Sequence, residues 1–216
     1  MNKGELLPEL HRVGLLRKGH FNLSSGAHTD TYIDKNVIYS HPWLIPHLAE
    51  NLSNEIDGSR QAGDLELPGI IISPALGALV LGYATTLKLS EKVGGHVGRL
   101  MRFAWCERNE EGKMVLKRGF DRVFDRDSSG YRSKVCIIED SLTTGRNVLE
   151  VKKEIERHGA KVEFVAALFN RGQVTKEILG VDKLAVLYDM TLPSWDPGKC
   201  PQCEKGVPLD HQFGHG

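Results

Sequence analysis

Short apolar runs alternate with segments of helical periodicity from the middle of the chain to near its C-terminus. Most residues within a run are apolar, and strands of this kind form parallel sheets covered by helices on both faces. The predicted strands occupy residues 69–73, 134–140, 162–170 and 183–189, with a weaker candidate at 98–107. The predicted helices occupy residues 43–56, 76–88, 145–158 and 174–180. The pattern therefore predicts an α/β fold with a central, mostly parallel sheet flanked by helices.

The charge balance excludes several classes of protein. Lysine plus arginine and aspartate plus glutamate both number 28, so the formal net charge is zero. The chain lacks the positive charge typical of proteins that bind nucleic acids or membrane surfaces. Residues 67–86 carry no charge, but Pro74, Gly77 and Gly82 interrupt them, which favours a buried strand and a helix over a membrane span. We expect neither nucleic acid nor a membrane among its partners.

The cysteines indicate a reducing compartment. They are Cys106, Cys136, Cys200 and Cys203, and the first two are isolated within predicted folded segments. This pattern fits free thiols better than a framework of disulfides. The N-terminal residues contain no apolar stretch of the kind found in secretory signals. The sequence therefore predicts a cytoplasmic protein.

The chain is predicted to form a single domain over residues 1–216. Within it we expect an N-terminal segment at 1–65, the α/β core at 66–190 and a C-terminal tail at 191–216. One long loop, residues 106–133, is rich in charge and interrupted by glycines, which is typical of a flexible hairpin or lid. Long loops in compact domains are often functional, so we expect this loop to serve a site.

The segment 135–147, VCIIEDSLTTGRN, carries the most specific chemistry in the sequence. Glu139 and Asp140 come at the end of a predicted buried strand, where ligands bind in open α/β sheets. The loop that follows offers hydroxyls, backbone N–H groups and the start of a helix, all of which favour a phosphate. Two carboxylates beside a phosphate cradle suit the hydroxyls of a sugar, so the segment predicts a ribose 5-phosphate site. The alternative is a strand that ends in an acidic pair followed by a serine or threonine N-cap.

This segment resembles the phosphoribosyl pyrophosphate (PRPP) motif of type I phosphoribosyltransferases. Further segments are similar to orotate phosphoribosyltransferases or to their pyrophosphate loop: GHFNLSSGAHTDTYIDK (19–35), IISPALGALVLG (71–82), ERNEEGKMVLKRGF (107–120) and ALFNRG (167–172). The resemblance implies the type I fold, with a small N-terminal hood and a mobile lid. It also implies transfer of ribose 5-phosphate from PRPP to orotate, which yields orotidine 5′-phosphate and pyrophosphate in pyrimidine (UMP) biosynthesis.

The resemblance also assigns roles to residues of this chain. PRPP is expected to bind Glu139, Asp140, Ser141, Leu142, Thr143, Thr144, Gly145, Arg146 and Asn147, with its pyrophosphate at Pro74, Ala75, Leu76 and Gly77. Orotate is expected at Tyr32, Thr143 and Arg171, and Arg108 and Lys113 of the lid are the predicted catalytic residues. Each assignment has an ordinary structural alternative. Tyr32 also fits a half-buried strand tyrosine, Arg171 a surface arginine, and the basic lid residues a solvated hairpin.

Cofactor and assembly are likewise implied by the resemblance. Mg²⁺ is expected to travel with the pyrophosphate and ribose hydroxyls of PRPP, without a dedicated cage of protein side chains. The lid of such enzymes commonly reaches into the neighbouring subunit, which implies a homodimer.

Two other functions remain open at this stage. One is a phosphoribosyltransferase for uracil or a purine base. The other is a catalytically silent regulator that binds PRPP, because Gly77 stands where the family often has a lysine and the lid lacks the pattern R-K-x-x-K-x-H. We favour the enzyme, since a lid and a base-side arginine serve catalysis and a binding module needs neither.

The C-terminal tail contains a separate set of metal-ligand residue types. Cys200 and Cys203 form C-x2-C, and His211 and His215 form H-x3-H, which are ligand types that zinc accepts. The spacing between the two pairs is shorter than in usual zinc motifs, which favours a reduced C-x2-C over a zinc site. His20 and His28 show no metal-binding spacing and are interpreted as loop histidines.

Overall fold

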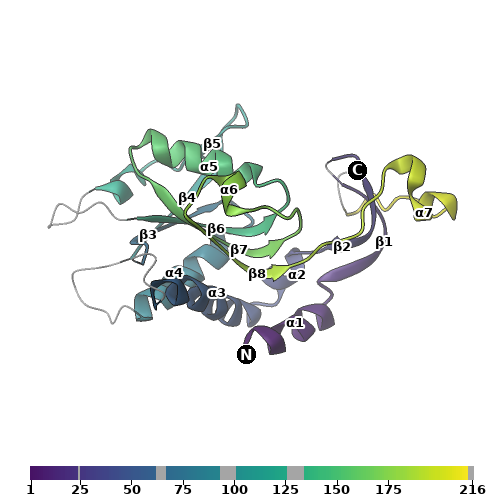
Figure 1. The fold of residues 1–216 in the computed structure, drawn as a ribbon, viewed down its shortest axis with the longest axis horizontal. Helices are drawn as coiled ribbons and strands as arrows, with labels where there is room; N and C mark the ends of the chain where they lie inside the picture. Colours follow the sequence, from purple (N-terminus) through teal and green to yellow (C-terminus); the bar gives the residue numbers. More distant parts are fainter. Residues whose placement is uncertain (24, 62–66, 93–100, 126–133, 214–216) are drawn as a thin grey trace. The chain divides into compact units, whose positions relative to one another are not determined.

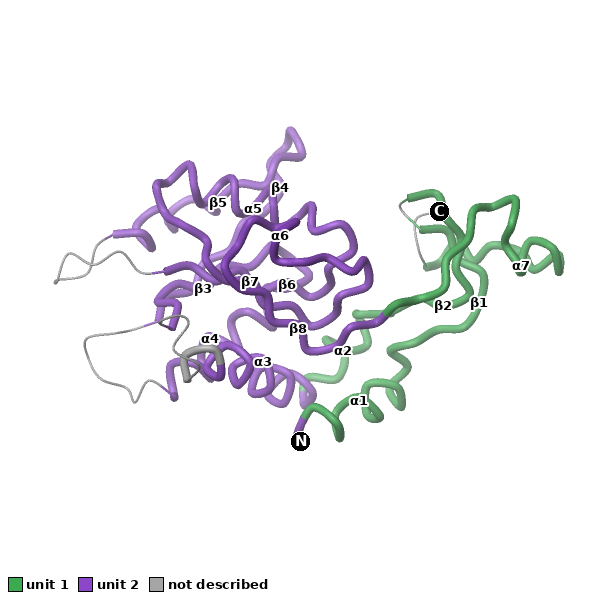
Figure 2. Tube along the Cα trace, in the orientation of Figure 1, with its two compact units in different colours: residues 1, 3–42, 191–216 green, residues 2, 43–190 purple. Residues whose placement is uncertain are grey.

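The computed structural model describes residues 1–23, 25–61, 67–92, 101–125 and 134–213, in two compact units (Figures 1 and 2). Unit 1 comprises residues 1, 3–42 and 191–216, and unit 2 comprises residues 2 and 43–190. This division differs from the predicted internal boundaries at two points. The helix after residue 43 groups with the α/β core instead of the N-terminal segment, and the predicted C-terminal tail groups with that N-terminal segment.

Unit 2 is built on a six-stranded sheet with the order β5-β4-β3-β6-β7-β8. Its strands are β3 (Ile70–Pro74), β4 (Arg102–Arg108), β5 (Met114–Leu116), β6 (Val135–Leu142), β7 (Val162–Asn170) and β8 (Lys183–Asp189). Neighbouring strands are parallel except for the antiparallel pair β4 and β5. The predicted mostly parallel sheet is therefore confirmed, and the weaker strand candidate near residue 102 is one of its strands.

Helices cover both faces of this sheet, as the apolar strands require. Figure 1 shows α3 (Leu44–Gln61) and α4 (Leu79–Lys92) on one face and α5 (Arg146–Arg157) on the other, while the short α6 (Lys176–Leu179) precedes β8. Every residue of β3 is buried, and so are the first six residues of β6. The stripe Val148, Val151 and Ile155 of α5 packs in one core cluster with Ile72 and Ile137. This packing fixes the start of α5 next to the end of β6.

The predicted hairpin at the start of the 106–133 loop is confirmed. β4 and β5 pair from Cys106 with Leu116 to Arg108 with Met114. The Asn109 side chain accepts hydrogen bonds from the backbone N–H groups of Glu111 and Lys113, at 3.1 and 2.9 Å, and so closes the turn. A 3-10 turn, η1 (Asp121–Phe124), follows. Residues 126–133 of the predicted lid lie outside the described residues.

Glu154 joins this hairpin to α5. Its carboxylate, with a side chain 8% exposed, accepts two hydrogen bonds from Arg157, both at 2.9 Å, and one from the Leu116 backbone N–H at 3.1 Å. The hydrogen bonds from Arg157 outweigh the opposing effect of burial and, with the Leu116 bond, lower the pKa of Glu154 to about 2. Ionised Glu154 therefore stabilises the contact between the hairpin and the helix.

Replacing Glu154 with glutamine is expected to lower the free energy of unfolding near neutral pH by about 1–3 kcal/mol, because a charged acceptor is lost from a buried network. The pKa of Glu154 in the folded protein lies below its ordinary value of 4.5. The contribution of ionised Glu154 to the free energy of unfolding is therefore present above pH 4.5 and is lost as the pH falls from there towards 2. Urea unfolding at several pH values measures this. Glu156→Gln on the same helix is the control, since Glu156 is 46% exposed and its pair with Lys152 contributes little. If the difference in the free energy of unfolding between the wild type and Glu154→Gln did not decrease in acid, ionised Glu154 would not be the source of the stabilisation.

Unit 1 combines the first and last segments of the chain. It contains α1 (Lys3–Arg12), the antiparallel strands β1 (Leu16–Asn22) and β2 (His28–Ile33), α2 (Asn36–Ser40), the 3-10 turn η2 (Pro197–Lys199) and α7 (Pro201–Glu204). The register of β1 against β2 shifts between Lys18 and Phe21, and His20 and Phe21 are both buried there. Such a bulge turns two successive side chains to the same side of the strand.

The uncharged stretch 67–86 forms a strand and a helix, as predicted from the proline and glycines that interrupt it. It includes β3 and the first part of α4, joined by a turn at residues 75–78. α4 begins at Leu79 and not at residue 76, because this turn takes up the first predicted residues of the helix. Within the described part of the chain, no helix is both long and apolar enough to cross a bilayer.

Candidate active site

The candidate site lies where three neighbouring strands of unit 2 end. β3, β6 and β7 are adjacent and parallel, so their carboxyl ends lie at the same edge of the sheet. The turn 74–77 follows β3, the pair Glu139–Asp140 lies near the end of β6, and Arg171 follows β7. The fold thus brings together three segments that the sequence singled out separately.

The acidic pair is buried beside the turn that follows β3. Glu139 and Asp140 are 4% and 3% exposed, and the Asp140 backbone N–H donates to Oε1 of Glu139 at 2.9 Å. A Cβ atom added at Gly77 would lie 2.4 Å from Oδ2 of Asp140. A side chain at position 77 therefore cannot fit without moving the carboxylate. The Ala75–Leu76 peptide bond in this turn is cis, and Leu76 is exposed.

The loop 143–147 presents hydroxyl and backbone groups at the start of α5. Thr143 and Thr144 are exposed, and Gly145 is the N-cap residue with a φ of 75°. This left-handed backbone favours glycine, and an added Cβ would also lie 2.7 Å from a methyl group of Leu179. The N-cap residue is a glycine and not the serine or threonine of the alternative, but Oγ1 of Thr144 accepts a hydrogen bond from the Arg146 backbone N–H, the first of α5, at 3.3 Å. The arrangement is suited to a phosphate.

The loop after β7 lies directly against the loop after β6. The backbone N–H groups of Arg171 and Gly172 donate to the carbonyl oxygen of Leu142 at 2.8 and 3.3 Å. A Cβ atom at Gly172 would lie only 1.5 Å from the carbonyl oxygen of Thr143. Asn170 closes the other side of this turn, because its side chain both donates to and accepts from the backbone of Val174 at 3.0 Å. Arg171 is therefore held next to the candidate phosphate loop.

Of the two predicted lid residues, Arg108 adjoins the loop 143–147. Its guanidinium donates to Oδ1 of Asn147 at 2.9 Å and lies 2.9 Å from a carboxylate oxygen of Glu150. Burial alone would raise the pKa of Glu150, but hydrogen bonds from Arg146 and Arg108 outweigh it, and the net pKa is lowered. Lys113 is instead 73% exposed and pairs with Glu111 at 2.7 Å. The structure thus brings Arg108 to the site and leaves Lys113 at the tip of the hairpin.

Tyr32 belongs to unit 1, in β2. Its ring is half-buried and lies 5.6 Å from that of Phe21 and 6.0 Å from that of Phe213. These contacts fit the alternative of a half-buried strand tyrosine. Its predicted contact with a base stays a prediction.

Three residues of this region were not predicted as functional: Glu150, Asn170 and Gly172. Glu150 and Gly172 act on segments distant from them in sequence, by holding Arg108 and by allowing Thr143 to approach, whereas Asn170 closes the turn after its own strand. The one local signal was the glycine after Arg171 at a strand end, since glycine is common where two backbones come close.

The chain is similar in sequence to proteins named orotate phosphoribosyltransferase. It is 36% identical over 204 residues to that protein of a Nitratiruptor species, covering 89% of this chain and 90% of the relative. It is 30% identical over 210 residues to the one from Desulforamulus reducens, covering 96% and 95%. No protein-family model matches the chain.

Solved structures with the same fold include enzymes for different bases. The crystal structure of orotate phosphoribosyltransferase from Aeropyrum pernix matches with a TM-score of 0.64 and 21% identity, over 86% of this chain and 93% of that one. Adenine phosphoribosyltransferase from Saccharomyces cerevisiae matches with a TM-score of 0.57 and 14% identity, over 86% and 99%. At this identity the structures support the predicted type I fold, and the fold alone does not distinguish the base.

Proposed function

The chain belongs to the orotate phosphoribosyltransferase family, and on that premise we propose how its own residues carry out the reaction. It is an enzyme that transfers ribose 5-phosphate from PRPP to orotate and yields orotidine 5′-phosphate and pyrophosphate, a step of pyrimidine biosynthesis. The observation that carries the residue assignments is the meeting of three segments at one sheet edge: the turn 74–77, the acidic pair and the Arg171 loop.

PRPP binds across the ends of β3 and β6. Its 5-phosphate lies at the loop 143–147, where threonine hydroxyls and backbone N–H groups surround it at the start of α5. Glu139 and Asp140 accept hydrogen bonds from the ribose hydroxyls. The pyrophosphate group lies at the turn 74–77, and the close approach of Gly77 to Asp140 supports this placement because the ribose and pyrophosphate positions must adjoin. One ligand then spans both elements.

In the reaction, the bond between C1′ and the pyrophosphate oxygen breaks as N1 of orotate forms its bond to C1′, and the proton that N1 loses is accepted by the departing pyrophosphate. The ribose acquires oxocarbenium character, and the electron pair of the broken bond moves onto the pyrophosphate. Catalysis of such a step depends mainly on positioning and on stabilisation of the developing charge. Arg108 and Lys113 supply positive charge to the leaving group from the hairpin, and the register of β4, in which Cys106 pairs with Pro74 at the pyrophosphate turn, supports the part of Arg108.

Mg²⁺ accompanies PRPP in this proposal. The buried carboxylates of Glu139 and Asp140 offer the oxygen donors that this ion prefers, so the residues at the site fit it. The ion supplies charge neutralisation to the pyrophosphate. The protein holds the ribose diol and the phosphates.

Orotate is recognised on the β7 side of the site, by Arg171 and Thr143, with Tyr32 covering the base. A guanidinium suits the carboxylate of orotate because it can donate two parallel hydrogen bonds. The backbone bond from Arg171 to Leu142 fixes the residue beside the proposed PRPP loop, which supports this role.

Replacing Arg171 with alanine is expected to raise the KM for orotate by roughly 10–100-fold, because a charge-assisted pair with the base is lost, while the KM for PRPP changes little. Steady-state kinetics with each substrate varied in turn separates the two effects. Arg12→Ala is the control, because Arg12 is exposed on α1, pairs with Glu9 one turn earlier and belongs to none of the segments placed at the site. Equal loss for both substrates would indicate a disturbed loop and not a lost base contact.

The choice of base is tested directly by pyrophosphate release. The purified chain is mixed with PRPP, Mg²⁺ and one of orotate, uracil, adenine, guanine or hypoxanthine. We expect release with orotate alone. Release with uracil or a purine would retain the PRPP assignments and refute those of Arg171 and Tyr32. Binding of PRPP without turnover on any base would favour the silent regulator.

The proposal extends to the oligomeric state of the enzyme and to its cellular compartment. The enzyme works as a homodimer, as the resemblance to the family implies, in which the hairpin tip with Lys113 serves the neighbouring site and Arg108 serves the site of its own chain. It resides in the cytoplasm, and the absence of a disulfide between any of the four cysteines, all of which the structure describes, supports a reducing compartment.

A further inference from the structure

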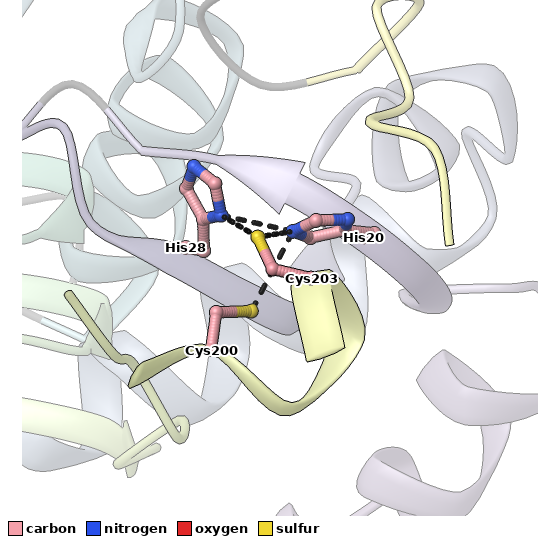
Figure 3. A group of neighbouring side chains, drawn as sticks. All are labelled: His20, His28, Cys200 and Cys203. Carbon is pink, nitrogen blue, oxygen red and sulfur yellow. Dashed lines mark hydrogen bonds between the residues drawn. The ribbon is translucent and has the colours of Figure 1, made fainter. Parts of the chain in front are cut away.

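Unit 1 contains a cluster of four metal-ligand side chains that the reaction does not use. They are His20 of β1, His28 of β2, Cys200 just before α7 and Cys203 within α7 (Figure 3). Three of the four are buried, with Cys200 at 0%, His20 at 3% and His28 at 8% exposure. The interpretation of His20 and His28 as loop histidines is wrong, because both lie in strands and point at the two thiols.

The spacing of the four ligand atoms fits one tetrahedral ion. Nε2 of His20 lies 3.5 Å from Sγ of Cys200 and 3.6 Å from Sγ of Cys203, and Nδ1 of His28 lies 3.3 Å from Sγ of Cys203. The two ring nitrogens are 2.9 Å apart, and all four ligand atoms lie within 4.8 Å of one another. A zinc ion with ordinary bond lengths separates its nitrogen and sulfur ligands by about 3.5 Å. The nitrogen–sulfur pairs are therefore already close to ligand distances, and the two ring nitrogens need to move apart by only a few tenths of an ångström to reach the roughly 3.3 Å of a tetrahedral zinc ion.

The orientation of His20 also suits a metal ligand. Its Nδ1 lies 2.7 Å from the carbonyl oxygen of Val207, which fixes the proton on Nδ1 and directs the lone pair of Nε2 at the cluster. Metal-binding histidines usually have such a partner on the second ring nitrogen. The bulge in β1 contributes, because it buries His20 on the same side as Phe21.

We propose that His20, His28, Cys200 and Cys203 form a structural zinc site. Two thiolates and two imidazoles in a tetrahedral arrangement are a common zinc environment, and the protein supplies all four ligands, so no position is left for a substrate. Of the ligands considered from sequence, the two cysteines belong to this site. His211 does not belong to it, and His215 lies outside the described residues.

The site joins the two ends of the chain within unit 1. The β1–β2 hairpin supplies the histidines, and the segment around α7 supplies the cysteines. Backbone bonds at 2.8 Å connect the same segments, from His28 to Trp195 in both directions and from Asp210 to His20. A small unit has a limited core, so a metal that holds two distant segments contributes directly to its folding.

The wild-type chain provides the first test. It is purified under reducing conditions, stripped with a chelator and titrated with Zn²⁺, and bound metal is counted by mass spectrometry of the native protein. We expect about one zinc ion per chain, and with Co²⁺ the absorption bands of a tetrahedral site with two thiolates. Failure to bind zinc, or a Cys200–Cys203 disulfide that persists under reduction, would overturn the proposal. Orotate turnover is measured in parallel, so a failure of the proposed function is seen separately.

Variants then identify the ligands. His28→Ala and Cys203→Ser are each expected to weaken zinc binding by more than about 10-fold. Loss of a residue that only hydrogen-bonds to a metal ligand already weakens binding by about 10-fold or more, and loss of a ligand itself has a larger effect. The matched control is the double variant His211→Ala/His215→Ala, which removes the two histidines of the C-terminal tail. This variant is expected to bind zinc as the wild type does. Loss of binding in the control with retention in His28→Ala would overturn the assignment. The cobalt spectrum of the wild type remains decisive if a variant does not fold.

Discussion

Replacing Asp140 with asparagine is expected to lower kcat/KM for PRPP by roughly 100- to 1,000-fold, the range seen when one preorganised hydrogen-bonding group is removed from an active site. The carboxylate is 3% exposed and lies against the turn at Gly77, so the change removes a negative charge between the proposed ribose and pyrophosphate positions. Asparagine has nearly the same shape, and the turn therefore keeps its place. Pyrophosphate release with PRPP varied at saturating orotate measures the effect.

Asp182→Asn is the matched control for this variant. Asp182 is an exposed carboxylate in the same unit, paired with Lys161 at 2.8 Å, and its loss is expected to leave kcat/KM unchanged. Thermal unfolding of both variants shows whether the fold is retained. An Asp140→Asn enzyme with nearly normal kcat/KM would refute the placement of PRPP at this pair.

The sheet of unit 2 was predictable because its signals are local. Strands buried on both faces consist of continuous apolar runs, as in Ile70–Pro74 and Val162–Asn170, and the stripe of α5 recurs at helical spacing. The carboxyl ends of parallel strands share one edge, so the position of Glu139 and Asp140 also followed from the sequence. Boundaries were less certain where a turn precedes a helix, as at residues 75–78 before α4.

The arrangement of unit 1 depends on contacts between distant residues. β1 and β2 lack a clear alternation, because the bulge buries His20 and Phe21 together, and no pattern in the sequence indicates their pairing. The sequence identifies the cysteines of the tail as possible metal ligands, but the histidines nearest to them in sequence are those of the tail itself. Their actual neighbours, His20 and His28, lie in the β1–β2 hairpin at the other end of the chain. The contact of Arg108 with Asn147 is similarly non-local and appears only in the folded chain.

Replacing Gly172 with alanine is expected to lower kcat/KM for PRPP by at least about 100-fold, since a displacement of about 1 Å at a catalytic site can have that effect. The added Cβ would lie 1.5 Å from the carbonyl oxygen of Thr143 and 2.5 Å from its carbonyl carbon. Both are backbone atoms of the proposed PRPP loop, so the clash cannot be relieved by rotating a side chain. The loop must move, and the hydroxyl and N–H groups that hold the 5-phosphate move with it.

Gly58→Ala is the matched control, because a Cβ atom at Gly58 meets nothing within 4 Å and the residue lies in α3. Alanine there is expected to leave activity unchanged and to raise stability by up to about 1 kcal/mol. The affinity for PRPP, measured by calorimetry, distinguishes a displaced phosphate loop from general unfolding. A folded Gly172→Ala protein that binds PRPP as tightly as the wild type would show that residues 143–147 do not hold the 5-phosphate, since the loop cannot keep its position beside an alanine.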